Sequence, residues 1–191
     1  MDIKTTKLPG VLLLKPRRFA DERGYFVETY NTQRFRQSGI MVQFVQDNQS
    51  FSLRKGTVRG LHFQLPPAVQ AKLIRVLRGS IFDVAVDLRL ESPTYGQWLA
   101  EEISAQGGEQ VFVPRGFAHG FCTLEPNTEV AYQVDSYYAL ASESGIIWND
   151  PSLNIPWPVV LNEAILSDKD RQLGTFKDLA SPFRYARQAD A

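Results

Sequence analysis

The sequence predicts an all-β chain that folds as a double-sheet jelly roll or barrel with a few short helices. Short strand-like segments dominate it, and glycine and proline turns separate them at regular spacing. The strongest period-two pattern runs over residues 80–88, where Val84 and Val86 alternate with Asp83, Ala85 and Asp87. Such alternation is typical of a strand with two different faces, which a double-sheet fold requires.

The remaining elements follow in chain order. The segment 21–24 is prone to turn, and Asn31 is suited to cap a helix over residues 32–38, which Gly39 would end. Arg78 and Gly79 suggest a tight hairpin joining two strands. After Pro151 the strand pattern loosens, and a second short helix is expected over residues 167–173. Strands are expected over residues 11–14, 25–30, 44–52, 57–64, 72–77, 80–88, 98–104, 110–113, 117–124 and 129–134.

Length and charge limit the classes of function. A chain of 191 residues suits one domain over residues 1–191, with a core from about 5 to 180 and a frayed tail over residues 188–191. The 21 lysines and arginines equal the 21 aspartates and glutamates, so the whole chain carries no basic surface for nucleic acid or an acidic membrane. An anionic ligand must therefore be held by a few local basic residues.

Cysteine content and the termini suggest a compartment. The single Cys122 excludes an internal disulfide framework and suits a reducing cytosol, where we expect it to be buried and inert. The first residues lack the basic segment, apolar run and cleavage site of a signal peptide. No apolar run approaches the roughly 20 residues that span a bilayer. The expectation is a soluble cytoplasmic protein.

The only two histidines, His62 and His119, lie in two segments that resemble the halves of the cupin signature. In the first segment His62 fits the signature, but Gln64 stands at its second histidine and Lys72 at its glutamate. In the second segment His119 fits and Thr123 replaces an asparagine. The glycine and proline positions that fit are Gly56, Gly79, Gly108, Pro114 and Gly116.

These replacements argue against a metal site. A cupin metal takes three histidines and a carboxylate, and here two of these ligands are missing and a cation occupies one position. We therefore expect no metal. A histidine and an ammonium group facing one pocket instead suit proton abstraction next to a carbonyl, with His62 as the base and Lys72 stabilising the enolate.

Six further motifs extend the resemblance to roughly residues 5–180. They are DERGYFVE at 21–28, QDNQS at 46–50, RGLHFQ at 59–64, PRGFAHGF at 114–121, WNDP at 148–151 and LSDKD at 166–170. Together they resemble the dTDP-4-dehydrorhamnose 3,5-epimerase family. One small departure is the segment 171–174, where a nearby proline is common, and it affects only the expected packing of the tail.

The resemblance implies a substrate and an assembly. The substrate would be a dTDP-linked 4-keto-6-deoxyhexose, dTDP-4-dehydro-6-deoxy-D-glucose, inverted at C3 and C5 to dTDP-4-dehydro-L-rhamnose on the route to dTDP-L-rhamnose. It implies no cofactor. It also implies a homodimer of cupin-like jelly-roll barrels in which N-terminal strands add to the partner's sheet.

The resemblance also assigns catalytic roles, each with a structural alternative. It makes His62 the proton acceptor, Tyr132 the proton donor and Asp170 the partner that orients His62. Asp83 is the competing partner, because it lies on the minor polar face of an apolar strand and could equally orient His119. His62 could instead be a hydrogen-bonded core histidine, Lys72 a solvated edge lysine and Tyr132 a core residue. The sequence SDKD at 167–170 also reads as a helix capping box.

Further residues map to positions that line the nucleotide-sugar site. Arginine offers a bidentate grip on pyrophosphate, and Phe26 would cover the thymine. Strict alternation would put Arg59 and His62 on opposite faces of one strand, so we expect a bulge there or a role for Arg59 at the edge of the site. The set is Arg23, Phe26, Glu28, Gln46, Asp47, Asn48, Arg59, His119, Tyr138, Glu143 and Lys169.

Three other functions compete with this one. A related enzyme could epimerise only C3 or isomerise a keto sugar, and it would differ in how Tyr132 and Tyr138 meet the sugar. A cupin that only binds a nucleotide sugar or acts as a regulatory module would need no acid–base pair. A metal-dependent cupin oxygenase is disfavoured by the missing ligands.

Overall fold

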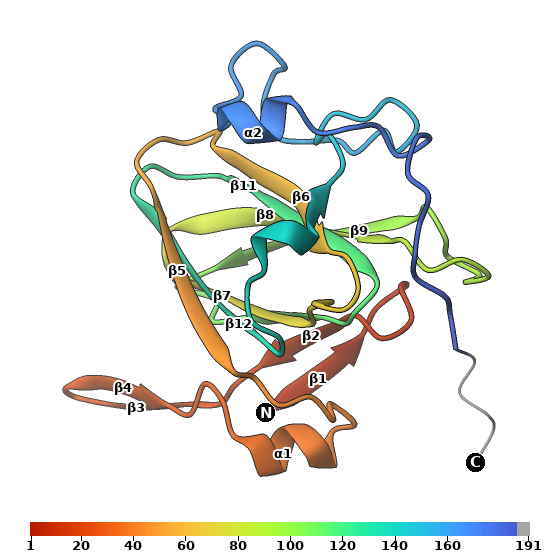
Figure 1. Ribbon diagram of the computed structural model, residues 1–191. Coiled ribbons are helices and arrows are strands. Elements are labelled where there is room, and N and C mark those ends of the chain that lie inside the picture. The colour runs from red at the N-terminus through yellow and green to blue at the C-terminus, as the bar shows by residue number, and fades with distance from the viewer. Residues whose placement is uncertain (187–191) are drawn as a thin grey trace.

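The computed structural model describes residues 1–186, and the tail predicted to fray, residues 188–191, lies outside this range. Two antiparallel sheets pack as two layers (Figure 1). The larger has the order β1 (Asp2–Thr5), β2 (Leu12–Lys15), β10 (Gln110–Val113), β7 (Lys72–Arg78), β12 (Thr128–Val134), β5 (Gln46–Ser52). The smaller has the order β13 (Glu143–Gly145), β6 (Val58–Gln64), β11 (Phe117–Thr123), β8 (Ser80–Asp87), β9 (Trp98–Ser104). The predicted all-β, double-sheet architecture is confirmed.

The strands predicted from residue 44 onward are present with similar bounds, but one predicted connection is wrong. The segment at Arg78 and Gly79 is not a hairpin, because β7 pairs with β10 and β12 while β8 pairs with β9 and β11. Gly79 has a φ of 77° and makes the expected tight turn, yet the chain crosses there from one sheet to the other. The turn residues determine where the chain reverses. Pairing with strands that are distant in the sequence determines which sheet each of the two flanking strands joins.

The core lies between the two sheets. Ile74 and Val130 of the larger sheet pack there against Ile81, Ala85 and Phe121 of the smaller one. Both faces of β8 are buried, because the other face, with Val84 and Val86, packs under segments from the C-terminal part of the chain. Each large apolar side chain removed from water in this way contributes about 1.5–3 kcal/mol. The two faces of the strand predicted over residues 80–88 therefore pack into two different hydrophobic clusters.

Two short α-helices flank the barrel. Helix α1 (Thr32–Gln37) begins as predicted at Asn31, whose side chain accepts a hydrogen bond from the amide of Arg34, and it ends at Ser38. Its one buried residue, Phe35, packs against Leu73 of the larger sheet. Helix α2 (Asp168–Arg171) is shorter than predicted, and a 3-10 helix, η1, spans Leu140–Ser142. Within residues 1–186 no helix combines the length and apolar character needed to cross a membrane.

The N-terminal part forms two separate units. Strands β1 and β2 add to the edge of the chain's own larger sheet. Strands β3 (Arg18–Asp21) and β4 (Gly24–Val27) form a two-stranded hairpin, with its turn where the sequence predicted one, that stands away from the barrel (Figure 1). Phe26 on this hairpin is 71% exposed and Tyr25 is 58% exposed. Two exposed aromatic rings on a protruding hairpin form a surface suited to contact another molecule.

Candidate active site

A bulge in β6 brings Arg59 and His62 to one face. His62 lies opposite His119 of β11 and Arg59 lies opposite Phe121, so three steps along β6 match two steps along β11. The extra residue in β6 turns both side chains to the same face of the sheet, whereas strict alternation would place them on opposite faces. Gly60 lies in the bulge with a φ of 124°, and a Cβ there would come within 2.6 Å of Cα of Gly120. The expected bulge is present.

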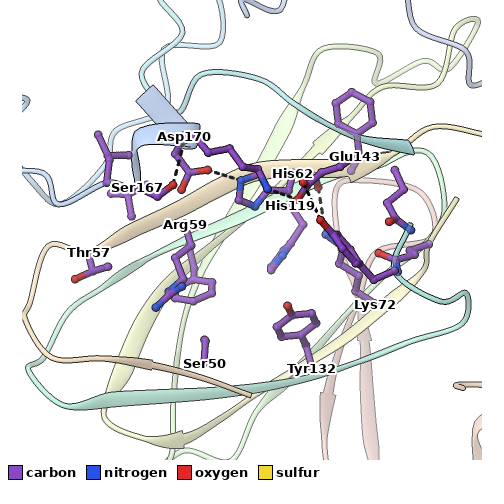
Figure 2. Close-up of a pocket in the computed structure, with 18 of the residues that line it drawn as sticks. Ser50, Thr57, Arg59, His62, Lys72, His119, Tyr132, Glu143, Ser167 and Asp170 are labelled. Carbon is purple, nitrogen blue, oxygen red and sulfur yellow. Dashed lines mark hydrogen bonds and ion pairs between the residues drawn. The ribbon is translucent and has the colours of Figure 1, made fainter. Parts of the chain in front are cut away.

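A cavity of about 490 Å³ opens between the two sheets at this bulge (Figure 2). His62 reaches it from β6 of the smaller sheet, and Tyr132 reaches it from β12 of the larger sheet. Of the residues predicted for the site, it gathers His62, Lys72, Tyr132, Asp170, Arg59, His119, Tyr138, Glu143 and Lys169. The four residues predicted to be catalytic thus line the same cavity.

His62 is oriented by a carboxylate from a distant helix. Nε2 of His62 lies 2.5 Å from Oδ1 of Asp170, which is the one buried residue of α2. Ser167 caps this helix, and its Oγ accepts a hydrogen bond from the amide of Asp170 at 3.1 Å. Burial opposes ionisation of Asp170, but the hydrogen bond and charge of His62, together with Ser167 and the charge of Lys169, outweigh it and lower the pKa of the carboxyl. The segment thus forms the predicted helix cap and also brings Asp170 into contact with His62.

The second histidine has its own carboxylate. Nε2 of His119 lies 2.8 Å from Oδ2 of Asp83, and both residues are buried. The structure therefore places Asp170 beside His62 and Asp83 beside His119, so the two aspartates do not compete.

Lys72 is a buried lysine, not a solvated one. It is 9% exposed, and its Nζ donates a hydrogen bond to the carbonyl oxygen of His62 at 3.2 Å. Burial lowers its pKa to about 8, while the charges of Asp83 and Glu143 act in the opposite direction. An ammonium group held in a partly desolvated pocket interacts strongly with any negative charge that develops beside it.

Tyr132 faces the cavity from the opposite sheet. Burial raises the pKa of its phenol, with Arg59 opposing that effect and Glu143 adding to it. The hydroxyl is therefore protonated at neutral pH and can donate a proton. Figure 2 shows Tyr132 and His62 on opposite sides of the cavity.

A chain of polar contacts forms one rim of the cavity. The hydroxyl of Tyr138 donates to Oε2 of Glu143 at 3.0 Å, and Lys169 contacts the other oxygen of this carboxylate. Burial opposes ionisation of Glu143, but these two contacts outweigh it and lower the pKa of the carboxyl. Glu143 is therefore an anion near neutral pH at the rim of the cavity.

Three predicted residues lie on or beside the protruding hairpin and do not line the cavity of this chain. Arg23 is bound to Asp21 at the hairpin's own turn, with 85% of its side chain exposed. Phe26 is exposed on β4, and Glu28 pairs with Arg34 of α1 at 3.1 Å.

The predicted run on β5 also lies outside the cavity lining. Asp47 faces the outer side of the larger sheet, beside Arg75. Gln46 donates to the side chain of Asn48 and accepts a hydrogen bond from the amide of Tyr138. Both ends of the Gln46 amide are thus hydrogen-bonded within the protein, one of them to the segment that carries Tyr138.

The cavity also contains polar residues that the sequence analysis did not single out. Ser50 follows Asn48 by two positions on β5, so simple alternation could have indicated that it shares its face. Thr57 precedes β6, and Gln70 lies in the connection that leads to β7. Thr57 and Gln70 belong to no recognised motif, whereas Ser50 lies in QDNQS and Ser167 in LSDKD, where the sequence analysis gave the serines no role in the cavity. The set is Ser50, Thr57, Gln70 and Ser167.

The positions of the cupin metal ligands have other uses here. The amide of Gln64 is engaged with backbone groups, and Lys72 places a cation where a carboxylate would stand. Within residues 1–186 no group of three or more histidines, cysteines and carboxylates gathers as a metal site would require. Cys122 is buried in a hydrophobic cluster with Val58 and Trp148, and burial raises the pKa of its thiol to about 11, which fits an unreactive side chain.

Comparison with known proteins gives consistent relatives. A family profile described as dTDP-4-dehydrorhamnose 3,5-epimerase matches residues 5–178. A protein of that name from Pseudomonas aeruginosa is 48% identical over 92% of this chain and 97% of its own length. The Bacillus anthracis enzyme, solved with TDP and PPi bound, is 51% identical with a TM-score of 0.89, covering 91% of this chain and 98% of that one. A Legionella pneumophila enzyme in complex with dTDP-4-keto-L-rhamnose is 40% identical with a TM-score of 0.92, covering 97% and 98%.

Proposed function

The chain belongs to the dTDP-4-dehydrorhamnose 3,5-epimerase family, and from this premise we propose that it converts dTDP-4-dehydro-6-deoxy-D-glucose to dTDP-4-dehydro-L-rhamnose. The observation that carries the proposal is the placement of His62 and Tyr132 on opposite walls of one cavity, with Lys72 also lining it. Inversion at carbon requires that one group removes a proton from one face and another returns a proton to the opposite face.

The reaction passes through an enolate. The C4 ketone acidifies the C–H bonds at C3 and C5, so His62 can take a proton from either carbon as a general base. The electron pair of the broken C–H bond moves to the C4 oxygen, where the Lys72 ammonium stabilises the negative charge. The phenol of Tyr132 then donates its proton to the opposite face of the carbon. Solvent exchanges protons with both groups, so no cofactor enters the balance.

Asp170 completes the base. By accepting a hydrogen bond from Nε2–H of His62, it leaves Nδ1 as the basic nitrogen and stabilises the imidazolium that forms. Arg59 and Lys169 line the same cavity and supply positive charge for the pyrophosphate of the substrate. The sequence analysis expected a few local basic residues to hold an anionic ligand, and these two residues of the cavity match that expectation.

The nucleotide site is completed by a second copy of the chain. Arg23, Phe26 and Glu28 lie on or next to a hairpin that stands away from its own barrel, so we assign them to the cavity of the partner in a homodimer. Exchange of this N-terminal segment is reciprocal, because a two-fold dimer repeats each contact. We further infer a cytoplasmic enzyme, since the one cysteine suits a reducing compartment.

Two rival functions are separated from this one by a single experiment. The purified protein is incubated with the keto sugar in deuterium oxide and followed by NMR. We expect deuterium at both C3 and C5 and a product inverted at both carbons. Exchange and inversion at C3 alone would identify a monoepimerase, and no exchange at either carbon would favour a module that only binds the nucleotide sugar.

Complementation between variants tests the shared site. Arg23→Ala and His62→Ala chains are each expected to be weakly active alone. When they are mixed after denaturation and refolded together, about half of the dimers are mixed, and each mixed dimer has one intact site if Arg23 acts on the partner. Activity should then recover to about a quarter of the wild-type value. No recovery in the mixture would place Arg23 outside the partner's site.

A further inference from the structure

Gln64 stands where the cupin signature has a metal-binding histidine, and the structure shows what it does instead. It ends β6 and is 4% exposed. Its Nε2 donates to the carbonyl oxygen of Ala68 at 2.7 Å and to that of Tyr137 at 3.3 Å. Its Oε1 accepts a hydrogen bond from the amide of Ala139 at 2.7 Å. One buried side chain thus joins two connections, the one from β6 to β7 and the one from β12 to β13.

The second of these connections, the segment 135–139, carries Tyr138 and is held at every residue by polar contacts. Asp135 accepts a hydrogen bond from the amide of Ala71, and the carbonyl oxygen of Ser136 accepts one from Gln70. The amide of Tyr138 donates to Oε1 of Gln46 at 3.0 Å. Gln46 of the larger sheet and Gln64 of the smaller sheet therefore hold adjacent amides of one segment.

Apolar packing does little to hold this segment. Tyr137 is 69% exposed, Tyr138 is 52% exposed and the following Leu140 is 75% exposed. Side chains this exposed provide little burial to fix a backbone. The position of the Tyr138 ring thus depends on the hydrogen bonds of its backbone, and Gln64 supplies two of them.

The chemistry of the contacts selects an amide at residue 64. Two carbonyl oxygens require two N–H donors from one group, and the amide of Ala139 requires an acceptor beside them. A glutamine side chain offers both. A carboxylate would face the carbonyl oxygens with lone pairs, and an apolar side chain would leave three partly buried backbone groups without their partner, which is costly.

We propose that Gln64 is a positioning residue for the epimerisation, which fixes the segment 135–139 and thereby places Tyr138 against Glu143 at the rim of the cavity. This inference rests on the proposed function. Gln64 does not act on the sugar itself, since its amide is engaged with backbone groups. Its effect reaches the reaction through the hydroxyl of Tyr138 and the carboxylate of Glu143.

A double-mutant cycle between Gln64 and Tyr138 tests this inference. Gln64→Met keeps the side-chain length and removes every polar contact, and we expect kcat/KM for double inversion to fall several-fold, because it misplaces the Tyr138 hydroxyl. Tyr138→Phe should lower kcat/KM several-fold in an otherwise wild-type chain. In the Gln64→Met background it should change the value by less than about twofold, because the hydroxyl is already misplaced.

Two controls separate positioning from general stability. Thr128→Val removes the buried hydrogen bond from Thr128 to Glu125 at the other end of β12, and it should lower the melting temperature without coupling to Tyr138→Phe. Amide hydrogen exchange should show that Gln64→Met reduces protection of the Ala139 amide at least tenfold while the strand amides of β12 keep theirs. If Gln64→Met does not fold, Gln46→Leu enters the same cycle, because it releases the neighbouring amide of Tyr138.

The outcomes are distinct. Additive effects of Gln64→Met and Tyr138→Phe, or a Tyr138→Phe enzyme with unchanged kcat/KM, would overturn the inference while leaving the epimerase activity in place. Unchanged protection of the Ala139 amide would overturn it as well. A wild-type protein that exchanges neither C3 nor C5 protons would instead overturn the proposed function.

Discussion

The carboxylate of Asp170 lies 2.5 Å from Nε2 of His62, although the two residues are 108 positions apart in the chain. The contact depends on a four-residue helix whose first turn is capped by Ser167, so a small local motif sets the direction of the carboxylate. In the proposed mechanism the carboxylate in turn sets the orientation and the tautomer of the imidazole. This dependence makes the pair the first target for mutation.

Asp170→Asn should lower kcat by about 10²–10⁴-fold with little change in dTDP affinity. The amide can present N–H to the imidazole, and it then favours the tautomer with the proton on the wrong nitrogen. Asp168→Asn is the matched control, because Asp168 is exposed on the same helix and should retain wild-type kcat. Steady-state kinetics and calorimetric titration with dTDP measure both effects. Equal kcat values for the two variants would remove Asp170 from the mechanism.

His62→Ala should abolish solvent exchange at both C3 and C5 while leaving dTDP binding nearly intact. Loss of a general base costs about 10²–10⁴-fold in rate. NMR in deuterium oxide measures the exchange. A variant that keeps more than about a tenth of the wild-type rate would direct the search for the base to His119, which is oriented by Asp83 in the same cavity.

Tyr132→Phe should separate exchange from inversion. The ring remains, so packing is preserved, and only the hydroxyl is lost. His62 can still remove a proton and return one to the same face, so we expect deuterium to enter the substrate while doubly inverted product falls, with C5 affected most. Product analysis by NMR checks this expectation. Unimpaired inversion at both carbons would show that another group or a water donates the proton.

The pH dependence of kcat/KM should report Lys72. Folding lowers the pKa of this lysine from 10.5 to about 8, so the ammonium form is present below that value and is lost as the pH rises through it. Because the enolate needs the ammonium form, kcat/KM should decline with an alkaline limb near pH 8. Initial rates between about pH 6 and 10 locate the limb. A profile that stays flat to pH 10 would exclude Lys72 as the group that stabilises the enolate.

Removal of metal ions should leave the activity unchanged. Lys72 and Gln64 occupy two of the four cupin ligand positions, and both are engaged in hydrogen bonds to backbone groups. We expect full activity after exhaustive chelation and no stoichiometric metal in the purified protein. One tightly bound transition metal per chain, with activity lost on its removal, would contradict this expectation.

Much of the site could be predicted because its chemistry depends on rare residues at fixed spacing. The two histidines and Lys72 were found because they occupy positions of the cupin signature. Strict alternation also predicted either a bulge between Arg59 and His62 or an edge role for Arg59, and the structure has the bulge. The pairing of Asp170 with His62 could not follow from spacing, because nothing local links residues so far apart. Family resemblance indicated it, and the structure shows the contact.

The errors and omissions have a common physical cause. Strands pair with partners that are distant in the sequence, so local residues do not determine the pairing. Gly79 correctly marked a turn, yet the sequence around it does not specify which sheet each flanking strand joins. In the same way, QDNQS was recognised as a motif, but whether Gln46 would face the ligand or support Tyr138 depends on a loop about 90 residues away. Such contacts exist only after the two sheets have packed.

The crossing of the chain at Gly79 has a consequence for the order of assembly. Because β7 and β8 are consecutive but belong to different sheets, neither sheet can close until strands from the second half of the chain have been made. Fold formation then depends on many distant pairings, which is typical of domains that fold in milliseconds to seconds. During synthesis the base at residue 62 emerges long before its partner at residue 170. The nascent chain therefore gains the proposed His62–Asp170 pair only after α2 has been made, and truncation before α2 should abolish catalysis.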